Sequence, residues 1–199
     1  MEHYFIEKQH SKNDFFEISQ KFLDKVYYFN SCDDIFSKNE VDYGTYVLVN
    51  TVIKTQNLSG KVLDVGCGYG VIGIVLADNF SNANFYMCDI NGTAVELSKQ
   101  NATKNKISNI KQIVKSNVYE NIEDTFDYII SNPPIKVGKE VLMQFLMGGY
   151  EKLNENGKLI FVIKKKFGEK TLRKKLAEKF SSVEVIEKDN GYYIIMAEK

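Results

Sequence analysis

The sequence predicts an α/β fold: a Rossmann-like, doubly wound sheet that is mostly parallel, with an antiparallel hairpin at its C-terminal edge and a short β-rich N-terminal extension. Three observations predict it. From residue 61 onward, short apolar runs alternate with segments of helical periodicity. A glycine-rich stretch joins one such run to a helix. The 199 residues, 44% of them hydrophobic, are enough for one core.

The N-terminal part of the chain differs from the rest, because aromatic residues crowd into short alternating runs. Residues 15–29 have the pattern of a β-hairpin or of two strands. Asp42 then suits the N-cap of a helix from Tyr43 to Lys54. No Pro- or Ser-rich linker follows, so we expect residues 1–57 to be an extension packed on a main domain of residues 58–199.

The main domain alternates strand and helix signals. The expected strands are 62–65, 84–89, 110–114, 126–131 and 158–164, and the expected helices are 71–77, 93–105, 140–153 and 169–180. Such alternation predicts parallel strands joined by helical crossovers. The final strands, 183–187 and 192–198, flank Asn190-Gly191, a hairpin turn signal, so they should pair antiparallel at one edge of the sheet.

The stretch from Lys61 to Gly73, KVLDVGCGYGVIG, predicts a buried strand that enters a turn and then a helix. Glycines suit such a turn because the backbone must adopt positive φ and because a ligand can approach a main chain without Cβ atoms. The helix that follows adds unpaired N–H groups at its N-terminus. The turn is therefore a candidate cofactor site.

The glycine spacing only partly identifies the cofactor. Nicotinamide and flavin sites favour G-x-G-x-x-G. Here the pattern is G-x-G-x-G-x-x-G, and an acidic residue, Asp64, precedes it at the strand end. On its own, the turn is also compatible with a tight crossover that binds nothing.

Two further strand ends carry polar residues. Asp89 ends the strand 84–89, where a carboxylate can accept both hydroxyls of a ribose; a helix N-cap is the alternative. Asn117 follows the strand 110–114 and could bind an adenine edge or be an ordinary turn residue. The carboxyl ends of parallel strands are where ligands bind in open α/β sheets.

The tetrad Asn132-Pro133-Pro134-Ile135 directly follows the apolar strand 126–131. Its prolines fix φ and keep the preceding residue extended, so the Asn132 amide and the Pro133 carbonyl can be held rigidly at the sheet edge. This position beside the glycine turn favours a functional role over a plain Asn-Pro turn.

Charge and cysteine content limit the function classes. The chain has 26 basic and 26 acidic residues, so no global field attracts nucleic acid or membrane. Residues 164–179, however, contain eight basic residues and two glutamates, a local net charge of +6. The three cysteines form no C-x-x-C pair, and the start lacks the apolar region of a signal peptide, so we expect a soluble, cytoplasmic protein that uses no metal.

Together these motifs resemble the class I S-adenosylmethionine-dependent methyltransferases, and more closely the small-domain group that contains ribosomal RNA guanine-N2 methyltransferases. The similarity runs from about Phe36 to the C-terminus, in the order IFSKNEVDYGT, LDVGCGYGVIG, CDIN, NPPI-x-x-G-K and GYYII. It implies the class I methyltransferase fold, S-adenosylmethionine as cofactor and methylation of an amino group.

The resemblance also implies roles for individual residues. The implied cofactor-binding residues are Asp64, Gly66, Cys67, Gly68, Tyr69, Gly70, Asp89, Ile90, Asn117, Asn132, Phe36 and Thr45. The tetrad Asn132, Pro133, Pro134 and Ile135 would hold the amine that is methylated. Asp42 belongs, with Phe36 and Thr45, to a segment that would cover the cofactor as a lid.

The substrate implied by the resemblance is a guanine N2 amine of small-subunit ribosomal RNA, free or in the assembled subunit. Ile135 favours this over adenine N6 or a glutamine amide, because enzymes for those targets usually carry an aromatic residue there to stack on the target. Alternatives are methylation of adenine N6, a protein glutamine or a small molecule, and a non-catalytic cofactor-binding module. Lys164, Lys165 and Lys166 are either RNA phosphate contacts or part of a solvated helix.

Overall fold

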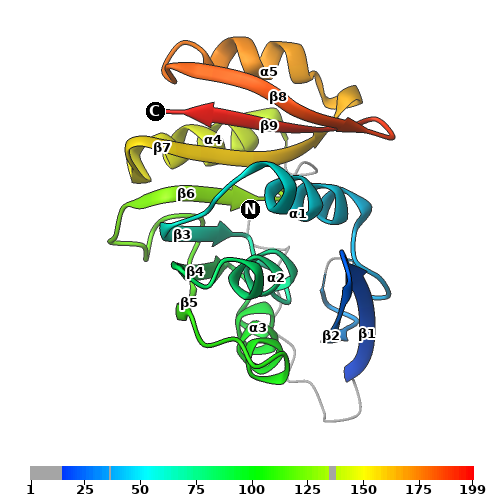
Figure 1. Ribbon diagram of the computed structural model, residues 1–199. Coiled ribbons are helices and arrows are strands. Elements are labelled where there is room, and N and C mark those ends of the chain that lie inside the picture. The colour runs from blue at the N-terminus through cyan, green and yellow to red at the C-terminus, as the bar shows by residue number, and fades with distance from the viewer. Residues whose placement is uncertain (1–14, 36, 135–137) are drawn as a thin grey trace.

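The computed structural model describes residues 15–35, 37–134 and 138–199. One sheet organises the molecule, with the strand order β5-β4-β3-β6-β7-β9-β8 (Figure 1). Its strands are β3 (Gly60–Val65), β4 (Ala83–Asp89), β5 (Ile110–Lys115), β6 (Phe126–Ser131), β7 (Leu153–Lys164), β8 (Ser182–Asp189) and β9 (Tyr192–Glu198). The helices are α1 (Tyr43–Thr55), α2 (Val71–Asn79), α3 (Gly92–Lys104), α4 (Lys139–Lys152) and α5 (Glu169–Leu176).

The pairing pattern of the sheet confirms the predicted fold class. Strands β5, β4, β3, β6 and β7 pair parallel, whereas β9 pairs antiparallel with both β7 and β8. The chain passes outward from β3 to β4 and β5, and then returns to place β6 on the other side of β3. The carboxyl ends of β3 and β6 are therefore neighbours at the switch point of the sheet, where open α/β folds bind ligands.

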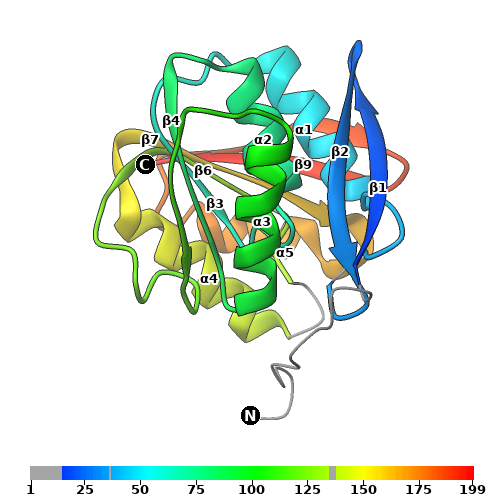
Figure 2. The same ribbon diagram turned by 90° about the horizontal axis from the view of Figure 1, so that it is seen from below.

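Helices cover both faces of the sheet, because alternate strand residues point to opposite sides. Val62, Ile130 and Ile160 pack in the layer that contains the buried side chains of α1, α2 and α3. Leu63 and Ile129 pack in the layer of α4 and α5. Figure 2 shows α1 and α2 on one side of the sheet and α4 on the other.

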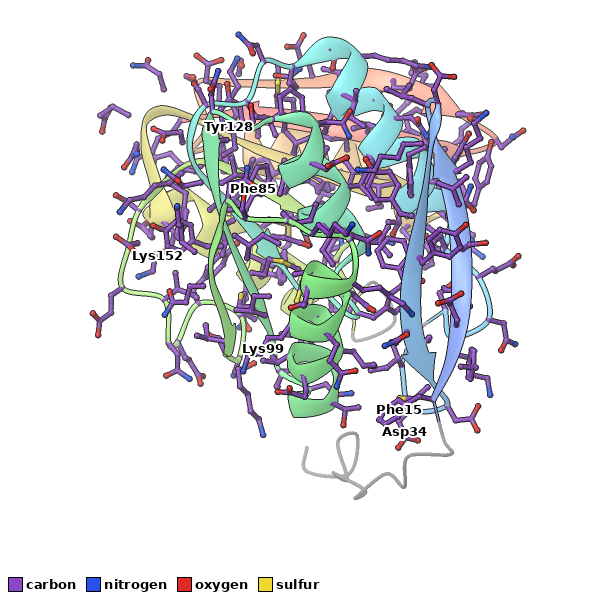
Figure 3. All side chains as sticks on the ribbon, turned by 60° about the horizontal axis from the view of Figure 1, so that its bottom comes forward. Phe15, Asp34, Phe85, Lys99, Tyr128 and Lys152 are labelled. Atoms are coloured by element: carbon purple, nitrogen blue, oxygen red, sulfur yellow. The ribbon has the colours of Figure 1, made fainter. Side chains whose placement is uncertain are left out.

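The side chains divide into a buried core and an exposed surface. Phe85 of β4 is fully buried and lies inside the molecule, whereas Lys99 projects from the exposed side of α3 (Figure 3). Among the described residues, no helix is both long and apolar enough to cross a membrane.

The N-terminal strands β1 (Phe15–Phe22) and β2 (Lys25–Cys32) form the predicted hairpin, as a separate two-stranded sheet. Strand β2 packs against α3. Two asparagines one turn apart on that helix hydrogen-bond the backbone of β2 as a neighbouring strand would. Asn101 exchanges two hydrogen bonds with the backbone of Asn30, and Asn105 does so with the backbone of Tyr28. The hairpin is thereby fixed beside the carboxyl ends of the parallel strands (Figure 1). The division of the chain near residue 57 stays a prediction.

Most predicted elements agree with the structure within a few residues, and two differ more. Strand β7 starts at Leu153, five residues before the predicted strand, because that buried side chain continues the pairing with Phe126 across a register shift. Helix α5 ends at Leu176 instead of residue 180. The chain turns there so that Phe180 packs edge-on against Tyr150, at 5.1 Å between ring centroids.

Candidate functional site

The glycine turn follows β3 and is held by backbone hydrogen bonds to the next strand. The N–H groups of Gly66 and Cys67 both donate to the Cys88 carbonyl, at 2.8 and 3.0 Å. Gly66 and Gly68 have φ values of 71° and 56°, in the left-handed region that favours glycine. The turn thus needs glycine for its backbone shape, as the sequence predicted.

The space on the two sides of the turn differs. Among the described residues, a Cβ atom on Gly66 or Gly68 would meet no atom within 4 Å other than those of its chain neighbours, so their outer side is open. A Cβ on Gly73 would lie 2.7 Å from the sulfur of Met87, so the helix side is closely packed. The later glycine therefore permits packing of α2 on β4, whereas Gly66 and Gly68 leave room for a ligand.

Asp64 lies beneath the turn and is 1% exposed. Its Oδ2 accepts a hydrogen bond from the Gly73 N–H at 2.9 Å, whereas its buried Oδ1 has no partner among the described residues. Burial raises the pKa of the Asp64 carboxyl to about 8, although the bond from Gly73 opposes the shift. The structure therefore places this residue as a buried support of the turn.

Asp89 ends β4 and stands beside the same turn. Its Oδ2 accepts from the Gly68 N–H at 2.8 Å and its Oδ1 accepts from the Asn91 N–H at 2.9 Å. Burial raises the pKa of Asp89, and these backbone donors oppose the rise. Asn91, not Asp89, caps α3, because its side chain accepts from the Thr93 N–H. The N-cap alternative for Asp89 is therefore wrong.

Two polar residues of α3, which are not among the residues predicted from the sequence, hydrogen-bond the turn from the helix side. Ser98 Oγ donates to the Gly68 carbonyl at 2.8 Å, and Asn101 Nδ2 donates to the Tyr69 carbonyl at 2.8 Å. Both side chains are fully buried. Polar residues three positions apart on the buried face of a predicted helix were the available signal.

Asn132 follows β6 and is half-buried at the switch point. Its Nδ2 donates to Asp42 Oδ2 at 3.0 Å and to Thr45 Oγ1 at 2.9 Å. Because a carboxylate only accepts, this contact fixes which end of the amide faces Asp42. Within the described part of the chain, Asn132 Oδ1 receives no hydrogen bond, so it is the acceptor left for a ligand.

The helix cap of α1 and the Asn132 side chain share one carboxylate. Asp42 Oδ2 also accepts from the Thr45 N–H at 3.1 Å, which is the predicted N-cap bond. Thr45 is 8% exposed. The structure thus brings Asp42 and Thr45 into contact with Asn132, whereas Phe36 lies outside the described residues.

The remaining tetrad and rim residues are placed as follows. Pro133 is buried and Pro134 exposed, and Ile135 lies outside the described residues. Ile90 follows Asp89 at the rim with intermediate exposure. Asn117 is exposed after β5, and its Nδ2 donates to Glu120 Oε1 at 2.7 Å.

The thiols near the turn are enclosed by other protein atoms. Cys67 and Cys88 are both buried, and burial raises the pKa of each, that of Cys88 to about 12. A protonated, enclosed thiol is a poor nucleophile. Among residues 15–35, 37–134 and 138–199, no group of His, Cys, Asp and Glu has the arrangement of a metal site.

The predicted RNA contacts lie at the carboxyl end of β7, at the same sheet edge. Lys164 Nζ sits 4.7 Å from the centroid of the Tyr192 ring, and contact with that residue raises the pKa of Lys164. Lys165 and Lys166 follow in a short 3-10 helix and are exposed. This strand end thus carries positive charge next to the Asn132 site.

Taken together, one sheet edge holds an open glycine turn, a half-buried carboxylate at its rim and an oriented amide oxygen. Tyr69, in the turn, has a buried ring whose hydroxyl lies 3.5 Å from the backbone oxygens of Ser37 and Glu40, so it ties the turn to the segment before α1. Such an edge can bind an extended cofactor along the turn and place a hydrogen-bonding amine next to it.

Sequence comparisons bear on this arrangement. Residues 26–196 match the family model described as "Methyltransferase small domain". Over its whole length the chain is 41% identical to Uncharacterized protein YbxB of Bacillus subtilis, of which it covers 98%. It is also 35% identical to Ribosomal RNA small subunit methyltransferase C of Actinobacillus pleuropneumoniae, over 82% of this chain and 49% of that protein.

A solved structure agrees with the sequence matches. A 16S rRNA N2 methyltransferase of T. thermophilus, in complex with AdoMet and guanosine, superposes with a TM-score of 0.82 and 25% sequence identity. The match covers 93% of this chain and 50% of that one. The chain therefore spans about half the length of these two ribosomal RNA methyltransferases.

Proposed function

The chain belongs to the methyltransferase small domain family, and we propose that it methylates the exocyclic N2 amine of a guanine in small-subunit ribosomal RNA. The observation that carries the proposal is the oriented Asn132 amide, one strand away from an open glycine turn. The similarity to Ribosomal RNA small subunit methyltransferase C and to a structure with bound guanosine supports the choice of substrate.

The residues around the turn fit S-adenosylmethionine. The empty space next to Gly66 and Gly68 admits a ligand against the main chain, and the Asp89 carboxylate stands at the rim of that space for the ribose hydroxyls. When bound, this cofactor supplies a methyl group on a positively charged sulfur, which is already a strong electrophile. The protein therefore mainly has to position the acceptor.

Asn132 and Pro133 position that acceptor in the proposed reaction. A guanine N2 amine is conjugated with its ring and is weakly nucleophilic. Asn132 Oδ1 and the Pro133 carbonyl oxygen accept its two hydrogens and turn its lone pair toward the methyl group. Alignment of two reactants can lower a barrier by about 7 to 11 kcal/mol. The methyl group would pass from the sulfur to the amine nitrogen, with S-adenosylhomocysteine as the leaving group. No strong base is required, because the alkylated amine readily loses one proton to solvent.

A direct test is transfer of labelled methyl from S-adenosylmethionine to assembled small ribosomal subunits, naked ribosomal RNA and total protein. Digestion to nucleosides then identifies the modified base. We expect N2-methylguanosine, and the preferred substrate will tell whether the enzyme acts on free RNA or on the assembled subunit in the cytoplasm. Label only in N6-methyladenosine, in protein or in a small molecule would overturn the guanine assignment and keep the family. Cofactor binding without any transfer would instead indicate a binding module.

A further inference from the structure

The surface around the β8–β9 tip contains two adjoining hollows with basic linings. The first, of about 550 Å³, is lined by Lys164, Lys165, Lys166, Asn190, Gly191 and Tyr192. The second, of about 640 Å³, lies between α5 and β8–β9, and its charged lining residues are Lys165, Glu169, Lys170, Arg173, Lys174 and Lys188. Lys165 lines both, so the two hollows adjoin at that residue; we term the second one the α5 groove.

The positive charge of the α5 groove is largely uncompensated. Its acidic lining residue, Glu169, is 7% exposed and lies 3.5 Å from the guanidinium of Arg173. Lys170, Lys174 and Lys188 are exposed and form no ion pair within the described part of the chain. A groove of this kind attracts a polyanion.

Aromatic rings accompany the lysines in both hollows. Tyr192 lines the first hollow and Tyr193 the α5 groove. Their side chains belong to opposite faces of β9, since Tyr192 packs with the α1 layer and Tyr193 with the α5 layer. Lys188 Nζ lies 5.4 Å from the centroid of the Tyr193 ring. Basic residues mixed with aromatic faces are the pattern that binds single-stranded nucleic acid, where bases stack and phosphates pair.

The first hollow adjoins the acceptor site. Tyr192 packs so closely on α1 that a Cβ on Gly44 would lie 2.7 Å from its ring. The Tyr43 hydroxyl donates to Asp189 Oδ2 at 2.8 Å, which fixes the tip of the hairpin to the first turn of α1. That turn begins at Asp42, which holds Asn132. Figure 1 shows the β8–β9 tip and the start of α1 at the same end of the molecule.

We infer that the α5 groove binds single-stranded RNA next to the target base. The RNA crosses the edge of the sheet at Lys165 and passes Tyr192 to reach Asn132. This inference rests on the proposed function and adds a binding surface to it. An acidic protein segment would match the charge but would leave the two tyrosine faces unused, so RNA is the better fit.

The test compares two triple variants with the same loss of charge. The groove variant carries Lys170→Ala, Lys174→Ala and Lys188→Ala. The control carries Lys21→Ala, Lys54→Ala and Lys111→Ala, on exposed lysines outside both hollows. Binding of a labelled single-stranded segment of small-subunit RNA is measured by fluorescence anisotropy over a salt series, without cofactor. The slope of log K against log salt should decrease in magnitude by about 2 in the groove variant, at about 0.7 per lost phosphate contact, and should stay unchanged in the control.

Separate measurements of RNA binding and of RNA methylation distinguish a failure of this inference from a failure of the proposed function. Equal slopes in both triple variants would overturn the α5 groove, even if the wild type produces N2-methylguanosine. If the wild type methylates no RNA, the proposed function fails, while the salt slopes still report on the groove. Competition by polyglutamate as effective as that by RNA of equal charge would assign the groove to acidic proteins and overturn the inference.

A substitution of Tyr193 tests the aromatic part of the inference separately from the charges. Tyr193→Leu keeps apolar bulk at a partly buried position. It should weaken RNA binding about fivefold or more through lost stacking, with an unchanged salt slope. Thermal unfolding of each variant identifies any that is misfolded. Wild-type affinity in a folded Tyr193→Leu variant would contradict the proposed stacking.

Discussion

The two halves of the site, on either side of the switch point, are built in different ways. The cofactor half, around the glycine turn, consists mainly of consecutive residues whose backbone groups bond to each other and to the carboxylates of Asp64 and Asp89. The other half, around Asn132, is the proposed site of the amine that accepts the methyl group, and we term it the acceptor half. It depends on side chains far apart in sequence, since Asn132 and Asp42 are 90 positions apart. We therefore expect changes in the first half to affect cofactor affinity and stability, and changes in the second to affect turnover.

The substitution with the largest expected effect on kcat distinguishes the two halves of the site most clearly. Asn132→Ala removes the oriented amide oxygen that would hold the amine. It should lower kcat about 100-fold or more, which is the loss that a misaligned reactant produces. Cofactor affinity, measured by isothermal titration calorimetry, should change little. Asn50→Ala is a matched control, because within the described part of the chain that half-buried amide donates only to the Tyr46 carbonyl of α1. Near-normal turnover by Asn132→Ala would refute the role of this residue.

The next effect concerns the cofactor half. In Gly68→Ala a side chain would occupy the open space of the turn at a φ of 56°, a left-handed conformation that costs an L-residue about 1 to 2 kcal/mol. We expect the Kd for S-adenosylmethionine to rise about tenfold or more. At saturating cofactor, kcat should stay within about twofold of the wild type.

A glycine nearby provides the contrast for that prediction. In Gly73→Ala the new Cβ would press on Met87, on the packed side of the turn. This variant should lower the Tm while the folded fraction still binds cofactor. If Gly68→Ala left the Kd for S-adenosylmethionine unchanged, the open side of the turn would not be the cofactor site.

The buried carboxylate beneath the turn should make stability depend on pH. The pKa of Asp64 rises from 3.8 to about 8 on folding, so between these values the folded protein binds more protons than the unfolded chain. The free energy of unfolding should therefore fall as pH rises, by at most about 1.4 kcal/mol per unit from this group, and level off above pH 8. Asp89, whose pKa is also raised, acts in the same direction.

Asp64→Asn tests this dependence, because an amide fills the same space and does not ionise. Urea unfolding at several values between about pH 5 and about pH 8 should give a shallower slope in the variant than in the wild type. The remaining slope belongs to other groups, Asp89 among them. A slope as steep as that of the wild type would show that Asp64 does not carry the effect.

The same difference between the halves explains what the sequence could predict. The turn and its strand, the carboxylate at the end of β4 and the tetrad after β6 are local signals, because each depends on neighbouring residues. The topology then brings them together, since parallel strands end at one edge. The cap of α1 by Asp42 is equally local and agrees with the structure.

The sequence does not show which distant segments contact each other. Helical periodicity indicated that α3 has a buried face, but not that Ser98 and Asn101 on that face would bond to the glycine turn. Likewise, one carboxylate of Asp42 serves both the helix cap and the Asn132 amide, and only the fold reveals the second partner. The lid over the cofactor that the resemblance implies for this segment stays a prediction, and the structure adds that Asp42 and Thr45 contact Asn132.

The smallest expected effect distinguishes these two roles for Thr45. Thr45→Val keeps the shape of the side chain and removes the oxygen that accepts from Asn132. One hydrogen bond contributes about 1 kcal/mol, so kcat should fall about fivefold while the Kd for S-adenosylmethionine stays unchanged. Thr45→Ser retains the oxygen and should restore most of the turnover. If the valine variant instead bound the cofactor more weakly at an unchanged kcat, Thr45 would be part of a cofactor lid. The acceptor half would then depend on Asp42 alone to orient Asn132.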